Sequence, residues 1–161
     1  MSTGSGTTNR KGRIIVGVDG SDPSRLALRW AQFIASATGS TLEAVAVWQA
    51  APAFGLVVNW DPAKLTSDGL RRTLDDVFGD EKPPGLVTTV EQGNTAQVLL
   101  ELSTGARMLV VGSRGHGGFA SLLLGSVGAA CTEHATCPVL VVHGTTPPPL
   151  PQPLPRTDVT S

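Results

Sequence analysis

Short apolar runs, separated by segments with helical periodicity, constrain the fold of this chain more than any other feature. The runs at residues 14–18, 108–111 and 138–142 contain no polar side chain. Such runs are typical of parallel strands buried on both faces, because a strand with one solvated face alternates apolar and polar residues. Two weaker runs, at 42–48 and 86–90, bring the number of predicted strands to five.

Helical periodicity fills the four intervals between these strands. The predicted helices are residues 23–38, 63–79, 95–102 and 126–134. Pro23 suits the first turn of the first helix, with Asp22 or Ser21 as its cap, and Asn94 or Thr95 caps the third. Strands that alternate with helices predict an α/β protein, a single-domain open five-stranded parallel sheet with helices on both faces.

The helix predicted at 63–79 carries charged residues at a helical spacing. Arg71 and Arg72 precede Asp75 and Asp76 by four residues. Opposite charges four apart on a helix stabilise it modestly. We therefore expect two ion pairs on the solvent side of this helix.

The two ends of the chain differ in composition from its middle. Residues 1–12 are rich in Ser, Thr and Gly and predict a flexible N-terminal arm. Residues 145–161 hold six of the twelve prolines and predict a flexible, polyproline II-like tail. The domain itself is expected at residues 13–144, a length that suits a single core.

Composition excludes several classes of protein. Twelve Lys and Arg stand against thirteen Asp and Glu, a net charge of −1, so nothing favours nucleic acid or an anionic membrane as a partner. No apolar run approaches the ~18–20 residues of a membrane span, and residues 1–12 lack the apolar core of a secretory signal. Cys131 and Cys137 do not make a disulfide framework, which predicts the reducing cytoplasm.

A glycine-rich loop follows the fourth predicted strand, at residues 112–126. Glycines let backbone N–H groups approach a ligand and can supply positive φ, and a helix N-terminus attracts anions. The loop therefore suits a polyphosphate, although it also suits a plain linker. Asp19, which ends the first strand, would accept hydrogen bonds from an adenosine or would cap a turn. Both loops lie at carboxyl ends of strands, so we expect a crevice between Asp19 and Gly112.

Other chemistry finds less support in the sequence. No lysine follows a glycine loop as a P-loop requires, and the match of residues 115–120 to the dinucleotide fingerprint lacks its acidic partner at a strand end. Cys131, His134 and Cys137 are three candidates where structural zinc needs four ligands. His116 has no nucleophile beside it. We therefore expect no catalytic residues and no metal site built from side chains.

Three segments together resemble the universal stress protein family. They are the opening Ile-Val-Gly-Val-Asp-Gly-Ser (15–21), the Leu-Val-Val-Gly-Ser-Arg-Gly at 109–115 and the closing Cys-Pro-Val-Leu-Val-Val (137–142). The spacing Gly112-x2-Gly115-x9-Gly125-Ser126 is similar to that of the family's ATP-binding subgroup. The resemblance implies a strand order of 3-2-1-4-5 and a regulatory protein that binds ATP, alone or with Mg²⁺, and at most hydrolyses it slowly.

The resemblance also implies ten site residues at the strand ends and in the loops. They are Val18, Asp19, Val47, Val111, Gly112, Arg114, Gly115, Gly125, Ser126 and Val127. The first three would contact the adenosine, and the last three would hold the phosphates at the start of a helix. Val111, Gly112 and Gly115 would lie along the ribose and phosphates. Arg114 either pairs with a phosphate or points to solvent.

Two alternatives to an ATP-binding stress-response protein remain open from the residues. One is a universal stress scaffold that binds no nucleotide and acts by dimerising and binding partners, against which the intact glycines count. The other is an adenylating enzyme of the α-hydrolase type. That chemistry needs a longer, glycine-rich loop after the first strand than residues 19–22 provide.

The fifth predicted strand also has an implication for assembly. In the order 3-2-1-4-5 it is an edge, and residues 138–142 carry no charge to protect it. We therefore expect a homodimer through this strand, which the family resemblance also implies, weakened by lysine at Leu140 or Val141. The alternative is that the tail from Thr145 folds back and blocks the edge.

Overall fold

A computed structural model describes residues 12–50, 55, 60–115 and 124–150. Within these residues five strands alternate with four helices. In chain order they are β1 (Arg13–Gly17), α1 (Asp22–Thr38), β2 (Thr41–Trp48), α2 (Pro62–Phe78), β3 (Val87–Gln92), α3 (Thr95–Ser103), β4 (Met108–Gly112), α4 (Ser126–His134) and β5 (Val139–Val142). Every predicted element is present, and no end is shifted by more than two residues.

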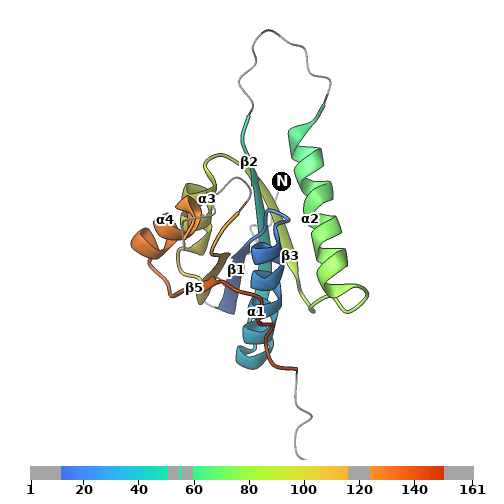
Figure 1. Cartoon of the computed structure of the whole chain (residues 1–161), viewed down its shortest axis with the longest axis vertical. Coiled ribbons are helices and arrows are strands. Elements are labelled where there is room, and N and C mark those ends of the chain that lie inside the picture. The colour runs from blue at the N-terminus through green and yellow to red at the C-terminus, as the bar shows by residue number, and fades with distance from the viewer. Residues whose placement is uncertain (1–11, 51–54, 56–59, 116–123, 151–161) are drawn as a thin grey trace, which may run out of the picture.

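All five strands run parallel in one sheet, in the order β3-β2-β1-β4-β5 (Figure 1). Val16 at the centre of β1 pairs with Ala44 of β2 on one side and with Val110 of β4 on the other. The α/β class, the single five-stranded sheet and the strand order are therefore confirmed. Because the order reverses between β1 and β4, their carboxyl ends flank the place where open sheets bind ligands.

Helices cover both faces of the sheet, as predicted. Alternate side chains of β1 point to opposite faces. Ile14 packs in a core with α1 and α2, and Ile15 packs in a second core with α3 and α4. Both isoleucines are fully buried. Within the described residues, no helix combines the length and the apolar character that crossing a bilayer requires.

A buried ion pair joins three strands on the α3 side of the sheet. The Arg13 guanidinium donates to Glu43, which is 2% exposed, and the Thr89 hydroxyl donates to the other oxygen of the same carboxylate. A charge this deep is stable only when it is paired and hydrogen-bonded. The cluster therefore ties β1, β2 and β3 together.

The helix N-termini differ in how their first N–H groups are satisfied. Ser21 caps α1, Asp61 caps α2 and Asn94 caps α3, each accepting from an N–H three residues on. The structure thus selects Ser21 over Asp22, and Asn94 over Thr95. Helix α4 begins after Gly125, which has no side chain to cap it.

The ion pairs expected on α2 are wrong in their partners. Asp76 pairs with Arg25 of α1 at 2.9 Å, and Asp75 pairs with Lys82 beyond the helix end. Arg71 pairs with Asp68 in the preceding turn. Sequence spacing within one helix could not reveal that α1 and the following turn lie close enough to compete.

The start of the C-terminal tail lies against α1. The indole Nε1 of Trp30 donates to the carbonyl oxygen of Thr146 at 3.0 Å. Figure 1 shows the chain leaving β5 and passing across α1 rather than along the outer edge of β5. The rest of the predicted arm and tail, residues 1–11 and 151–161, lies outside the described residues.

Candidate functional site

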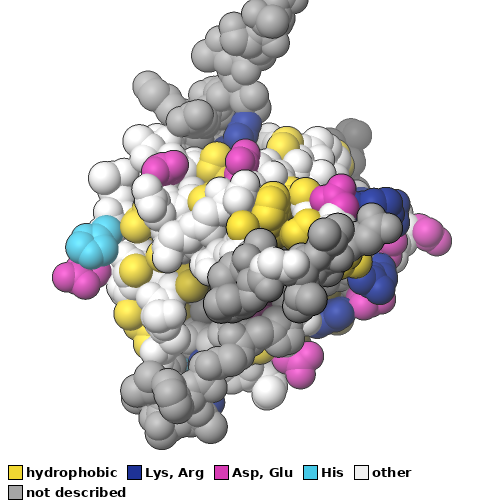
Figure 2. Space-filling model, turned by 90° about the horizontal axis from the view of Figure 1, so that it is seen from above, with side chains coloured by type: hydrophobic (Ala, Val, Ile, Leu, Met, Phe, Trp, Pro, Cys, Tyr) yellow, Lys and Arg dark blue, Asp and Glu magenta, His cyan; other side chains and the backbone are white. Residues whose placement is uncertain are grey.

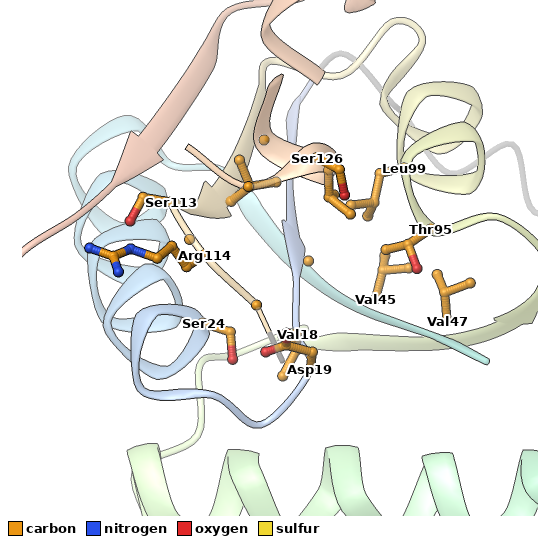
Figure 3. Close-up of a pocket in the computed structure, with 17 residues that line it drawn as sticks. Val18, Asp19, Ser24, Val45, Val47, Thr95, Leu99, Ser113, Arg114 and Ser126 are labelled. Carbon is orange, nitrogen blue, oxygen red and sulfur yellow. The ribbon is translucent and has the colours of Figure 1, made fainter. Parts of the chain in front are cut away.

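A cavity of about 320 Å³ lies at the carboxyl edge of the sheet, between the ends of β1 and β4 and the starts of α3 and α4. Figure 2 looks onto this edge, and Figure 3 shows the cavity in close-up. All ten residues singled out in the sequence line it: Val18, Asp19, Val47, Val111, Gly112, Arg114, Gly115, Gly125, Ser126 and Val127. The crevice expected between Asp19 and Gly112 is therefore present.

One side of the cavity is apolar. Val45 and Val47 of β2 line it together with Leu99 of α3, and they lie close together in Figure 3. Gly17 leaves room for this arrangement, because a Cβ there would sit 2.9 Å from Leu99 Cδ1. This side can accept a flat apolar group such as a purine ring.

Asp19 has the turn-capping role, one of the two between which the sequence could not decide. Its Oδ1 accepts from the backbone N–H of Ser21 at 3.0 Å and also from the Ser21 hydroxyl, which orders the turn before α1. An ideal Cβ on Gly115 would overlap Asp19 Oδ2. One oxygen of the carboxylate therefore serves the turn, and the other faces the glycine loop.

Two glycines of the site, Gly112 and Gly115, allow a close approach between loops and do not have positive φ. A Cβ at Gly112 would lie 2.8 Å from the carbonyl carbon of Pro23, at the start of α1. The described glycines with positive φ, such as Gly20, do not include Gly112, Gly115 or Gly125. The expectation that these loop glycines supply positive φ is therefore wrong for all three.

The N-terminus of α4 opens into the cavity. The backbone N–H of Gly125 donates to the carbonyl oxygen of Ser113 at 2.6 Å, which fixes the start of the helix against the end of β4. Ser126, Val127 and Gly128 begin the helix and line the cavity. The first N–H groups of a helix have no partner within the helix, so these groups can donate hydrogen bonds to an anion.

Arg114 is exposed, and in Figure 3 its side chain extends away from the apolar side of the cavity. Seven further lining residues were missed in the sequence: Gly17, Ser24, Val45, Thr95, Leu99, Ser113 and Gly128. Thr95 was detectable, because it starts a helix after a strand whose end lies at the same edge. The others depend on how the helices pack. His116 and the interior of the glycine loop lie outside the described residues.

The two cysteines pack in the apolar core on the side of the sheet that α3 and α4 cover. Cys131 is fully buried, and burial raises the pKa of its thiol to about 11. Cys137 packs against the same apolar cluster. Across the residues that the structure describes, no three His, Cys, Asp or Glu side chains gather where they could hold a metal ion.

Fold and site together define an open α/β protein with a cavity at the reversal of strand order. The sequence profile of the universal stress protein family matches residues 11–143. The chain therefore belongs to the universal stress protein family.

Similar proteins agree with the assignment of the chain to this family. A universal stress protein of Mycolicibacterium smegmatis is 31% identical over 140 residues, which cover 81% of this chain and 48% of that protein. One of Mycobacterium tuberculosis is 30% identical, with 81% and 47% covered. The chain thus spans about half the length of these relatives.

Solved structures share the fold. The universal stress protein UspA from Lactobacillus plantarum superposes with a TM-score of 0.70 at 24% identity, covering 83% of this chain and 99% of that one. A universal stress protein in complex with cAMP superposes with a TM-score of 0.63 at 27% identity, covering 81% and 96%.

Proposed function

We propose that this chain is a regulatory protein that binds ATP in the cavity between β1 and β4. The observation that carries the proposal is the start of α4. It is a helix N-terminus without a side-chain cap, and it forms one wall of a cavity whose other wall is apolar. Such a pairing suits a ligand with an anionic end and a flat apolar end.

The phosphates would lie against the backbone of α4. The N–H groups of Ser126 and Val127 point along the helix axis toward the cavity end, where the helix dipole favours negative charge. The Ser126 side chain is exposed and can add its hydroxyl as a donor. Gly112 and Gly115 leave the approach free of side chains.

The adenosine would occupy the opposite part of the cavity. Val45, Val47 and Leu99 would contact the ring, and the Asp19 carboxylate would accept from the adenosine. Asp19 is the one carboxylate among the described lining residues, so Mg²⁺ would be held chiefly by the nucleotide's own phosphates. The cAMP complex of a relative 27% identical supports an adenine nucleotide as the ligand class.

A binding role fits the described residues better than turnover. The lining side chains that the structure describes include no His, Cys or Lys to act as a base or nucleophile beside Ser126. Hydrolysis would at most be slow, and occupancy of the site would be the signal. We place this function in the cytoplasm.

Calorimetry on one matched pair of variants tests the site. Ser126→Ala removes only the hydroxyl, whereas Ser126→Pro also removes the first helical N–H. Proline is tolerated at this helix position, and Gly125 has the extended φ and ψ (−72°, 169°) that a residue before proline adopts.

We expect the wild type to bind one ATP, Ser126→Ala to bind it a few-fold more weakly, and Ser126→Pro to lose about tenfold or more. AMP should respond far less to either change. Equal ATP affinities for the proline and alanine variants would exclude the α4 N-terminus as the phosphate site.

We further propose a homodimer through β5. The strand is an edge in the sheet order, and the described part of the tail lies against α1 instead of covering it. Its residues Val139–Val142 carry no charge, so the unpaired backbone groups are open to a second copy.

A further inference from the structure

A second cavity, of about 580 Å³, lies on the other face of the sheet, between the ends of β1 and β2 and helix α2. It shares Val18, Asp19 and Val47 with the first cavity, so the tips of the two strands separate the two spaces. Its volume falls within the roughly 300–1,000 Å³ of small-molecule sites. The proposed nucleotide function does not use it.

The wall of the second cavity along α2 and β2 is mixed, with apolar side chains beside Thr66, Thr73 and charged residues. Ala46 and Leu70 are buried at its base, at 4% exposed each. Leu65 precedes Leu70 by five residues on α2. It lines the rim of the cavity and is 50% exposed. A large apolar side chain held half in solvent at a cavity mouth is suited to contact the apolar body of a ligand.

Of the four charged residues that line the cavity, Arg25 and Asp76 pair with each other, which leaves Arg72 and the carboxylate of Asp19. Arg25 donates to Asp76 at 2.9 Å and to the carbonyl oxygen of Gly20 at 3.1 Å. Asp19 directs Oδ1 to Ser21, and its Oδ2 lies beside the glycine loop of the first cavity. Within the described part of the chain, Arg72 makes no hydrogen bond and no ion pair within 4 Å, although its charge, after those of Lys64 and Arg71, helps to lower the pKa of the Asp68 carboxyl.

Figure 2 shows this distribution from above. Charged side chains gather on the side of the molecule where α2 lies, and apolar side chains lie toward the middle of the same face. The neighbouring Arg71 is equally exposed but pairs with Asp68 at 3.1 Å, and it does not line the cavity.

We propose that the second cavity binds a small organic anion with an apolar body. Leu65, Leu70 and Ala46 would contact the body, and Arg72 would pair with the anionic group at the mouth. The proposal does not rest on the nucleotide site, although the two cavities share Val18, Asp19 and Val47, because it is tested without ATP.

Gly69 provides a way to close this cavity without disturbing the core. It lines the cavity from α2, and a Cβ added there meets no atom within 4 Å. Gly69→Phe should therefore fill the space. Gly69→Ala is the control, because it also replaces the helical glycine by a better helix former, by up to about 1 kcal/mol, while leaving the cavity open.

The probe is 8-anilinonaphthalene-1-sulfonate, which has an aromatic body and one sulfonate group. Its fluorescence is measured while it is titrated with the full chain. The uncharged N-phenyl-1-naphthylamine has the same body without the anion. The variants are Gly69→Phe, Gly69→Ala, Arg72→Gln and the control Arg71→Gln, each confirmed as folded by its melting curve.

We expect the wild type and Gly69→Ala each to bind one molecule of the sulfonate probe saturably. In Gly69→Phe the affinity for this probe should fall about tenfold or more. Arg72→Gln should weaken the sulfonate about threefold to fivefold and leave the uncharged probe unchanged, with Arg71→Gln like the wild type. Wild-type affinity in Gly69→Phe, or equal effects of the two arginine variants on the sulfonate, would overturn the proposal. If Gly69→Phe does not fold, the arginine comparison alone decides.

Discussion

The carboxylate of Asp19 fills the space that a side chain at residue 115 would need. An ideal Cβ on Gly115 would overlap Asp19 Oδ2, although the two residues lie in different loops, after β1 and after β4. The same carboxylate is held from the other side by the N–H and hydroxyl of Ser21. The two loops thus have no spare room between them, and a change in one must move the other.

Gly115→Ala should weaken ATP binding by displacing Asp19. Asp19→Ala alone should cost about 1.5–3 kcal/mol in affinity, the worth of a charge-assisted hydrogen bond. Once Asp19 is removed, Gly115→Ala should add little, because the group that it displaces is gone. Calorimetry on the four corners of this double-mutant cycle measures the coupling. Additive losses would mean that Gly115 contacts the ligand directly and does not act through Asp19.

Gly125→Ser should change stability and ATP affinity in opposite directions. Serine at the N-cap can accept from the N–H groups that the glycine leaves open, and its Cβ would make only ordinary contacts, 3.4 Å from Ser113 O. Stability should rise by a few tenths of a kcal/mol, whereas the phosphates lose their donors and ATP affinity should fall about tenfold. Urea denaturation and calorimetry on the same preparation give both quantities. A variant that binds ATP as well as the wild type would contradict the open helix end as the phosphate site.

The homodimer should depend on the outward N–H of Val141. The carbonyls of Pro138 and Val142 accept from β4, so the alternate residues Val139 and Val141 direct their backbone groups away from it. Val141→Pro removes one outward donor, while Val141→Ala shortens the side chain and keeps the donor. We expect sedimentation at tens of micromolar to show dimers for the wild type, for Val141→Ala and for a chain lacking residues 147–161, and monomers for Val141→Pro. A monomeric wild type would refute the edge pairing.

The Cys131 thiol should make the fold less stable at high pH. Burial raises its pKa to about 11 from an ordinary value of 9.0, so the thiol stays protonated in the folded chain while the unfolded chain can ionise it. The contribution of this thiol to the free energy of unfolding is complete below pH 9 and is lost between about pH 9 and 11, by about 2–3 kcal/mol. Because lysines titrate in the same range, the measurement is the difference in unfolding free energy between the wild type and Cys131→Ala. That difference should shrink as the pH rises, and a constant difference would argue against the raised pKa.

The strands could be predicted because each carries its signal locally. The runs at 14–18, 108–111 and 138–142 are apolar throughout, and the structure places them at the centre and one edge of the sheet. For α1 and α3 the sequence predicted two candidate capping residues, because residue types that can cap a helix are adjacent at 21–22 and 94–95. The choice between such neighbours depends on backbone geometry that composition does not show.

Contacts between elements distant in the sequence could not be predicted. The loop glycines were identified from their spacing. Residue 112 must be a glycine because its backbone lies close to Pro23, which is distant in the sequence. The ion pair of Arg25 with Asp76 joins two helices, and the spacing of four within α2 pointed to other partners. The second cavity had no sequence signal, because it exists only through the packing of α2 over the ends of β1 and β2.

The first cavity is walled to a large extent by main chain. At Gly17, Gly112 and Gly115 a Cβ would come closer than 3.0 Å to a neighbouring atom. In a saturation mutagenesis experiment, such positions would respond to the volume of the new side chain and hardly to its charge. A library built on these positions would therefore yield few variants with a new ligand preference. Selection for a different ligand would advance through insertions and deletions that move the loops, rather than through exchange of side chains.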